Sequence, residues 1–200
     1  MTRMTTLLVA LAAGATSAVA APLNLTPMAP DVASGFIIIT YNAGSGAFAA
    51  SGFTQNISLP GPSQQPAGLR QFSLTAVVSN AGVASSGTLL VKTDFGSADS
   101  VAFQSSDLTA FGFDSFNKFE FVFAQQAGNL ASVGSDIGTI LVSPSLMFAN
   151  NVPDFSQSFT NDPFGFGFGD GNADTFLIPA PGAAAVLGLA GLFASRRRRA

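Results

Sequence analysis

The sequence of 200 residues contains no cysteine, histidine or tryptophan, and it has a single tyrosine, Tyr41, and a single glutamate, Glu120. Without cysteine, the chain forms no disulfide and offers no thiolate to a metal ion. Without histidine and cysteine, a Ser-His-Asp triad, a Cys-His pair and a zinc hydrolase site are excluded. No glycine-rich nucleotide-binding motif follows an expected strand. These absences disfavour an enzyme.

Basic residues are also scarce once the two ends of the chain are set aside. Arg3 and the four arginines at 196–199 lie in the terminal segments, which leaves only Arg70, Lys92 and Lys118 in the body. All eleven acidic residues lie in that body, so three positive charges against eleven negative charges give −8. This acidity keeps an exported protein soluble, and it disfavours binding to nucleic acid or to an anionic membrane surface.

The N-terminal residues 1–20 have the three parts of a secretory signal peptide. Arg3 supplies the positive charge, residues 7–13 form a short apolar run, and Ala18-Val19-Ala20 forms the A-x-A site. We therefore expect cleavage before Ala21. An uncleaved N-terminal anchor is the alternative, and the shortness of the apolar run makes it the weaker one.

The C-terminus carries an apolar segment followed by a cluster of arginines. Residues 183–195 contain no charge. As a helix at about 1.5 Å per residue they span about 20 Å, which is short of a hydrocarbon core of about 30 Å. Arg196, Arg197, Arg198 and Arg199 follow, and we expect them to stay on the cytoplasmic side. The alternative, a buried amphipathic helix, lacks a polar face. A transient membrane signal is therefore favoured.

The order of a Pro179-Ala180-Pro181-Gly182 motif, an apolar helix and an arginine cluster resembles the PEP-CTERM sorting signal of bacterial surface proteins. The resemblance covers residues 178–200, and Ala180 stands where that family usually has glutamate. It implies two partners, the export machinery and an exosortase-type membrane protease that cuts near the proline motif. It also implies an inner-membrane intermediate with a transmembrane helix, followed by release to the cell surface or extracellular matrix.

Residues 21–177, between the two signals, have the composition of one all-β domain. Glycine, phenylalanine, serine and threonine are abundant, while the lysine, arginine and glutamate typical of amphipathic helices are scarce. Turn signals recur every eight to twelve residues. We predict an antiparallel β-sandwich or jelly roll of eight to ten strands. The expected strands are 36–42, 47–55, 69–79, 88–93, 100–103, 116–124, 136–143, 146–149 and 174–178.

The clearest strand predicts which residues face the core. Phe119, Phe121 and Phe123 alternate with Lys118, Glu120 and Val122, so the phenylalanines should line the core and Glu120 should be solvated. A weak polysaccharide-active enzyme would need Glu120 and an aspartate as its carboxylate pair. The predicted exposure of Glu120 disfavours that hypothesis.

A weak candidate for a metal site lies near the end of the domain. Asp170, Asn172 and Asp174 place oxygen atoms at alternate positions, like the first half of an EF-hand loop, and Asn161 and Asp162 are close in sequence. Thr175 replaces the required glycine, however, and Pro181 stands where the bidentate glutamate belongs. A turn rich in Asx residues is the favoured interpretation, so calcium is a low-ranking expectation and no other cofactor is expected.

Three phenylalanines that alternate with glycine, Phe164, Phe166 and Phe168, form either an exposed adhesive ribbon or a cap on the core. A sugar-binding platform normally uses Trp and Tyr, so a core-capping or glycine-flexible segment is favoured over a sugar platform. The leading functional hypothesis is a non-catalytic exported protein of structural or adhesive type. The alternative is a surface module that binds calcium or carbohydrate, such as extracellular polysaccharide.

Overall fold

The computed structural model describes residues 21–59, 69–94, 99–114, 117–130, 135–146, 148 and 152–178. The predicted signal peptide and the predicted sorting motif with its helix and arginines lie outside these residues. Ten strands account for most of the described chain, and none of the described residues is helical. The strands are β1 (Asp31–Asn42), β2 (Ala47–Ser58), β3 (Arg70–Val78), β4 (Ala84–Thr93), β5 (Ser100–Ser105), β6 (Leu108–Phe113), β7 (Lys118–Ala124), β8 (Asp136–Val142), β9 (Phe159–Thr160) and β10 (Gly171–Ile178).

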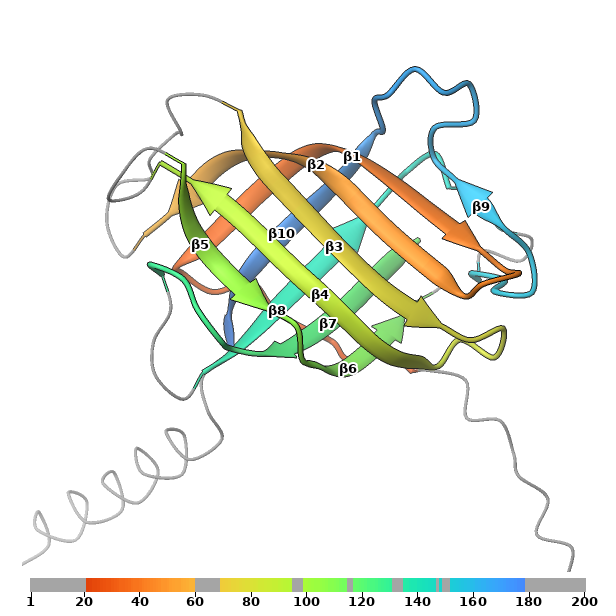
Figure 1. The fold of residues 1–200 in the computed structure, drawn as a ribbon, viewed down its shortest axis with the longest axis horizontal. Helices are drawn as coiled ribbons and strands as arrows, with labels where there is room; N and C mark the ends of the chain where they lie inside the picture. Colours follow the sequence, from red (N-terminus) through yellow and green to blue (C-terminus); the bar gives the residue numbers. More distant parts are fainter. Residues whose placement is uncertain are drawn as a thin grey trace, which may run out of the picture.

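All ten strands belong to one antiparallel sheet, in the order β5-β4-β3-β2-β1-β10-β8-β7-β6, with β9 paired to the end of β1. The sheet curls into a half-barrel (Figure 1). Strands β2 to β5 form the layer at the front of the view, and β10, β8, β7 and β6 cross behind them at a steep angle. The all-β, antiparallel prediction is confirmed. A sandwich or jelly roll is not, because the two layers are parts of one continuous sheet.

The long strand β1 joins the two layers and carries the irregularities that let the sheet bend. Its register with β2 shifts twice, between Ala33 and Ser34 and between Gly35 and Ile38. Phe36, within the second shift, has a φ of 55°, which is left-handed and uncommon for a side chain of this size. Such bulges bend the strand and increase its twist. The curvature that encloses the core therefore originates partly in β1.

The core between the layers is rich in phenylalanine. Phe119, Phe121 and Phe123 are completely buried, which confirms the inward face predicted for β7. Phe48 of β2 lies across from them, with ring centroids 5.3 Å from Phe119 and 5.4 Å from Phe121. These edge and tilted contacts between rings hold the front and back layers of the curled sheet together.

The strand predictions are largely right, and their errors have local causes. Ser143, Leu146 and Phe148 are not in a strand, so the strand expected at 146–149 is wrong where the structure describes it. Strand β6 was missed because its sequence, LTAFGF, has no clear alternation. Strand β9 was missed because it has only two residues. Strand β10 begins at Gly171, so part of the expected Asx-rich turn is extended.

Candidate interaction surface

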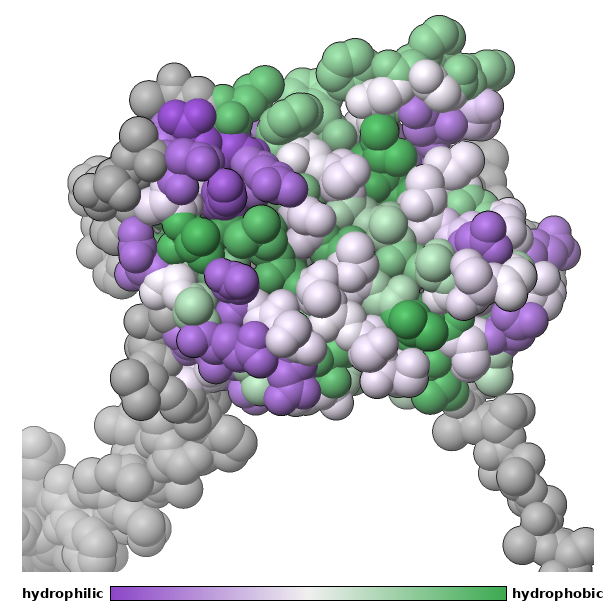
Figure 2. All heavy atoms as spheres, viewed as in Figure 1, coloured by the Kyte–Doolittle hydropathy of each residue, from purple (hydrophilic) through white to green (hydrophobic). Residues whose placement is uncertain are grey.

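The loop from residue 161 to residue 170, between β9 and β10, exposes three phenylalanines. Phe164, Phe166 and Phe168 are 79%, 76% and 66% exposed, more than any other large hydrophobic side chain that the structure describes. The loop stands at the upper right of Figure 1, and Figure 2 shows hydrophobic residues gathered along that upper edge. We call these three residues the aromatic ribbon. Their exposure contradicts core capping, which was one of the two favoured interpretations beside a glycine-flexible segment.

The backbone of the ribbon is fixed by a carboxylate and by two glycines. The Asp162 carboxylate accepts hydrogen bonds from the N–H groups of Phe166 and Gly167, each at 2.9 Å. Gly165 and Gly167 have φ values of 69° and 79°, the left-handed region that glycine adopts without cost. The phenylalanines alternate with glycine because the turn needs glycine, and the turn directs the rings to solvent.

Asn161 ties the base of the loop to strand β1. It is 6% exposed, its Oδ1 accepts the N–H of Ile39 at 2.7 Å, and its Nδ2 donates to the carbonyl of Ile37 at 2.8 Å. The pairing of β1 with β10 ends at Ile37, and its pairing with β9 begins at Thr40. Between these points the side-chain amide of Asn161 supplies the hydrogen bonds that a neighbouring strand would make. In the sequence Asn161 stands near the calcium candidate, and no local pattern there predicts this role.

Asp170 closes the other side of the base. Its carboxylate accepts hydrogen bonds from the hydroxyls of Ser143 and Ser145, from the N–H of Ser145 and from Asn161 Nδ2, at 2.6 to 3.2 Å. Burial alone would raise the pKa of Asp170, but the hydrogen bonds from Ser143, Ser145 and Asn161 outweigh burial and hold it below its usual value. The two ends of the loop are therefore joined by one polar network.

The residues of the calcium candidate have other partners and positions in this structure. Asp170 is occupied by the donors of Ser143, Ser145 and Asn161, and Asn172 Nδ2 donates to the carbonyl of Asp170 at 3.3 Å. Asn172 and Asp174 lie within β10 rather than in a loop. No group of three or more potential acidic ligands occurs among the residues that the structure describes. These residues do not fit a calcium ion as they stand, and Asp162 holds the ribbon backbone instead.

Asp174 is half-buried on the outer face of β10. Burial, and then the negative charge of Asp31 on the neighbouring strand β1, raise its pKa. The register places Asp31 opposite Phe176 and Ala33 opposite Asp174, so the two carboxylates are diagonal neighbours. Ionising Asp174 in this half-buried position beside Asp31 therefore costs stability.

Glu120 is completely buried, and the prediction that it is solvated is wrong. Its carboxylate accepts hydrogen bonds from the N–H groups of Leu23, Asn24 and Leu25 at 2.5, 3.0 and 2.9 Å, and from Lys118 Nζ at 3.0 Å. Asn24 has a φ of 57°, which helps three successive N–H groups to point at one carboxylate. The N-terminal segment thus covers Glu120, and the carboxylate has a structural use.

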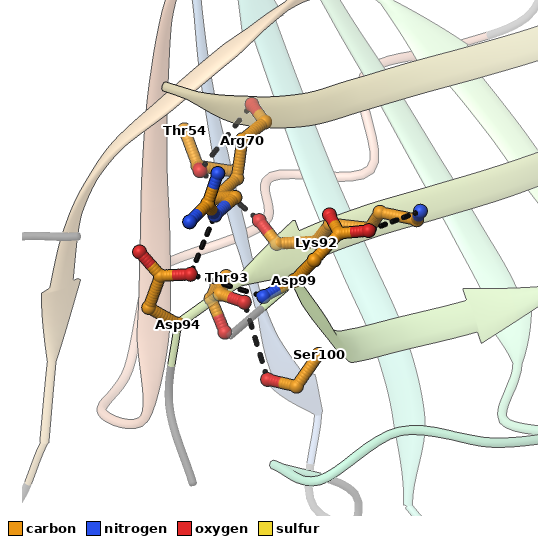
Figure 3. Close-up of polar contacts among 7 residues, drawn as sticks. All are labelled: Thr54, Arg70, Lys92, Thr93, Asp94, Asp99 and Ser100. Atoms are coloured by element: carbon orange, nitrogen blue, oxygen red, sulfur yellow. Dashed lines mark hydrogen bonds and ion pairs between the residues drawn. The ribbon is translucent and has the colours of Figure 1, made fainter. Parts of the chain in front are cut away.

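A second charged cluster lies at the end of the sheet away from the aromatic ribbon (Figure 1), and Figure 3 shows its contacts in close-up. Arg70 Nε donates to the Asp94 carboxylate, which also accepts the N–H of Asp99, and Lys92 pairs with Asp99 at 3.1 Å. The hydrogen bond to Asp94 raises the pKa of Arg70, although burial opposes that shift. Thr54 Oγ1 donates to the carbonyl of Lys92 at 3.0 Å. These contacts join the ends of β2, β3 and β4.

Comparison of the chain with protein-family models, with curated proteins and with solved structures found no match. Within the described part of the chain, no helix is long and apolar enough to cross a membrane.

Proposed function

We propose that the chain is a non-catalytic protein of the cell surface or extracellular matrix, with a structural or adhesive role, exported by its signal peptide and sorted by its C-terminal signal. The observation that carries the proposal is the aromatic ribbon of Phe164, Phe166 and Phe168, which is largely exposed. Grouped apolar side chains on a soluble protein mark an interaction site more often than isolated ones. A whole aromatic side chain buries about 150–250 Å², and about three quarters of each of these rings is open to a partner.

The position of the ribbon supports a role in contact with the surroundings. Strand β10 leads away from the base of the loop and ends at Ile178, about 25 Å along the chain at about 3.3 Å per residue. Asp31, where β1 begins, lies opposite Phe176 near that far end. In Figure 1 the loop rises at the top while the C-terminal end of β10 lies low in the molecule. A chain tethered at its C-terminus would point the ribbon outward.

The use of the carboxylates supports a non-catalytic role. Glu120, on which a glycoside-cleaving site would have depended, is buried and accepts four hydrogen bonds. Asp170 accepts four as well. Carboxylates whose oxygens accept hydrogen bonds from the protein itself stabilise the fold and are not free to act on a substrate.

The test is retention of the exported protein on its native cells and matrix. The variant F164S/F166S/F168S removes the aromatic rings but leaves the glycines and Asp162 that shape the turn. We expect the variant to be exported normally and to wash from the cell surface into the medium. The matched control is L69S/V83S, because Leu69 and Val83 are also exposed, at 62% and 48%. Equal retention of the ribbon variant and the wild type would contradict the proposal.

A further inference from the structure

A hollow of about 360 Å³ lies on the outer face of the front layer. Its residues are far in sequence from those of the aromatic ribbon. Two rows of paired residues form the hollow across three strands. Ala49, Thr75 and Thr88 make one row, and Ala47, Val77 and Ser86 make the other. All six side chains are small or β-branched, so the pleated surface is low there. We call this the small-residue hollow.

Gly87, which also lines the small-residue hollow, pairs with Ala76 on the inward face of the layer. A Cβ on Gly87 would approach the carbonyl oxygen of Thr75 to 2.7 Å, a distance that real Cβ atoms do not reach. Thr75 and Thr88 satisfy each other through a hydroxyl–hydroxyl hydrogen bond of 2.7 Å. Their methyl groups and those of the alanines are therefore left to face a partner.

The charges of the two surfaces suit each other. No charged residue lines the hollow, and residues of neutral hydropathy cover the middle of the front layer in Figure 2. The ribbon, in contrast, is accompanied by the acidic side chains of Asp162 and Asp170 and by no lysine or arginine between residues 152 and 178. An anionic partner would be repelled by the ribbon, whereas an uncharged apolar hollow would accept it.

Size also favours the match. An apolar cavity of about 150 Å³ accommodates benzene, so a hollow of 360 Å³ has room for a phenyl ring. The exposed parts of three phenylalanines supply about 300–500 Å² for one partner. Stable complexes bury about 800 Å² per partner. A contact of this size is weak, so it forms between free molecules at high protein concentration and becomes strong when many copies are held close together.

We propose that the aromatic ribbon of one copy docks in the small-residue hollow of a second copy, so that the chain associates head to tail. The ribbon lies on the loop before β10 and the hollow on β2, β3 and β4, so each copy has one donor and one acceptor surface. Contacts between different surfaces of identical molecules form open chains unless the rotation closes a ring. The inference rests on the proposed structural or adhesive function and gives that role a mechanism.

The experiment uses purified exported protein and two variants that each disable one surface. F164S/F166S/F168S removes the donor surface. T75E places a carboxylate in the middle of the acceptor surface, where it meets acidic neighbours of the incoming ribbon. The matched control Q71E adds the same charge to the same face of β3, outside the hollow. Thermal unfolding confirms that each variant is folded before sedimentation velocity is measured over a range of concentrations.

We expect wild type and Q71E to form species that lengthen with concentration, and each surface variant to stay monomeric alone. An equimolar mixture of the two variants should form dimers and nothing longer, because only one ribbon and one hollow remain to pair. Monomeric wild type, assembly of either surface variant, or a mixture that stays monomeric would each overturn the inference. If the wild type is monomeric but the ribbon is still needed for retention on cells, this inference fails and the proposed function stands.

Discussion

Glu120 shows how a single residue can be assigned to the correct face and still be misjudged. Alternation along β7 correctly separates Glu120 from the inward-facing phenylalanines. The prediction that Glu120 is exposed was wrong because the residues that cover it, Leu23, Asn24 and Leu25, are about 95 residues away in sequence. Periodicity within one strand carries no information about a distant segment that packs over it. The resulting cluster is predicted to be a major source of stability.

Replacing Glu120 with glutamine should lower the free energy of unfolding by about 1.5–3 kcal/mol, the usual contribution of a hydrogen bond to a charged group. The amide presents N–H groups to backbone N–H donors and removes the charge that Lys118 faces. Urea denaturation measures the change, and limited proteolysis should cut near residues 21–25. The control D107N alters an exposed carboxylate and should change stability by less than about 0.5 kcal/mol. Unchanged stability and protection in E120Q would contradict this role.

For Asp174, in contrast to Glu120, we predict that removing the charge raises the free energy of unfolding. Its pKa is raised by burial and by Asp31, so the folded state binds a proton more tightly than the unfolded chain does. The cost of ionising Asp174 is therefore absent at acid pH, where both states are protonated, and is fully present above the raised folded-state pKa. Asp174→Asn should unfold at higher denaturant concentration than wild type at neutral pH. The two proteins should converge as the pH falls, and a pH-independent difference would argue against this explanation.

Among the elements, strand β6 and the N-terminal segment depend on each other. Gly112 of β6 lies opposite Glu120 of β7. A Cβ on Gly112 would collide with the carbonyl oxygen of Ala21 and come within 3.0 Å of the Leu23 nitrogen. The missing side chain leaves the space in which the segment reaches Glu120. The lone glycine that obscured β6 in the sequence is thus explained by packing.

Substituting Gly112 with alanine should displace the N-terminal segment while leaving Glu120 in place. We expect the amides of Leu23, Asn24 and Leu25 to lose protection in hydrogen exchange, together with a lower melting temperature. Gly44→Ala is the control, because a Cβ there meets only the Asn42 side chain, at 3.3 Å. Full protection of the three amides in G112A would show that the segment does not need this space.

The loop before β10 shows which parts of a site a sequence can reveal. The pattern of alternating phenylalanine and glycine identified the aromatic ribbon as one of two alternatives. Choosing between core and solvent required Asp162, whose carboxylate turns the backbone, and Asn161, which anchors the loop to β1. The roles of Asp162 and Asn161 depend on tertiary contacts that the sequence does not reveal. This explains why the exposed arrangement was not favoured. Long alternating strands such as β3 and β7, by contrast, were predictable because the core selects one face.

At the scale of the whole molecule, the curled sheet separates three surfaces. The ribbon lies at one end of the sheet, the cluster of Arg70, Asp94 and Asp99 at the other, and the small-residue hollow on the front layer. No periodicity in the sequence predicts this separation, because it follows from the order in which the strands pair in the sheet. The terminal signals, in contrast, are predictions from sequence patterns that need no fold.

The terminal arginines are predicted to control release. Changing Arg196–Arg199 together to glutamine removes the positive charge that should hold the chain end on the cytoplasmic side. We expect the variant to accumulate unprocessed or in the wrong compartment, as measured by cell fractionation and mass. Four lysines at the same positions keep the charge and serve as the control. Normal release of the glutamine variant would contradict the sorting hypothesis.

Export and processing at both ends can be tested by the intact mass of the protein recovered from its native cell surface or medium. We predict a species that begins near Ala21 and ends near Pro179 or Pro181, which would establish both cleavages. A species that keeps Arg196–Arg199 would contradict processing by an exosortase-type protease and indicate a domain tethered to the membrane instead.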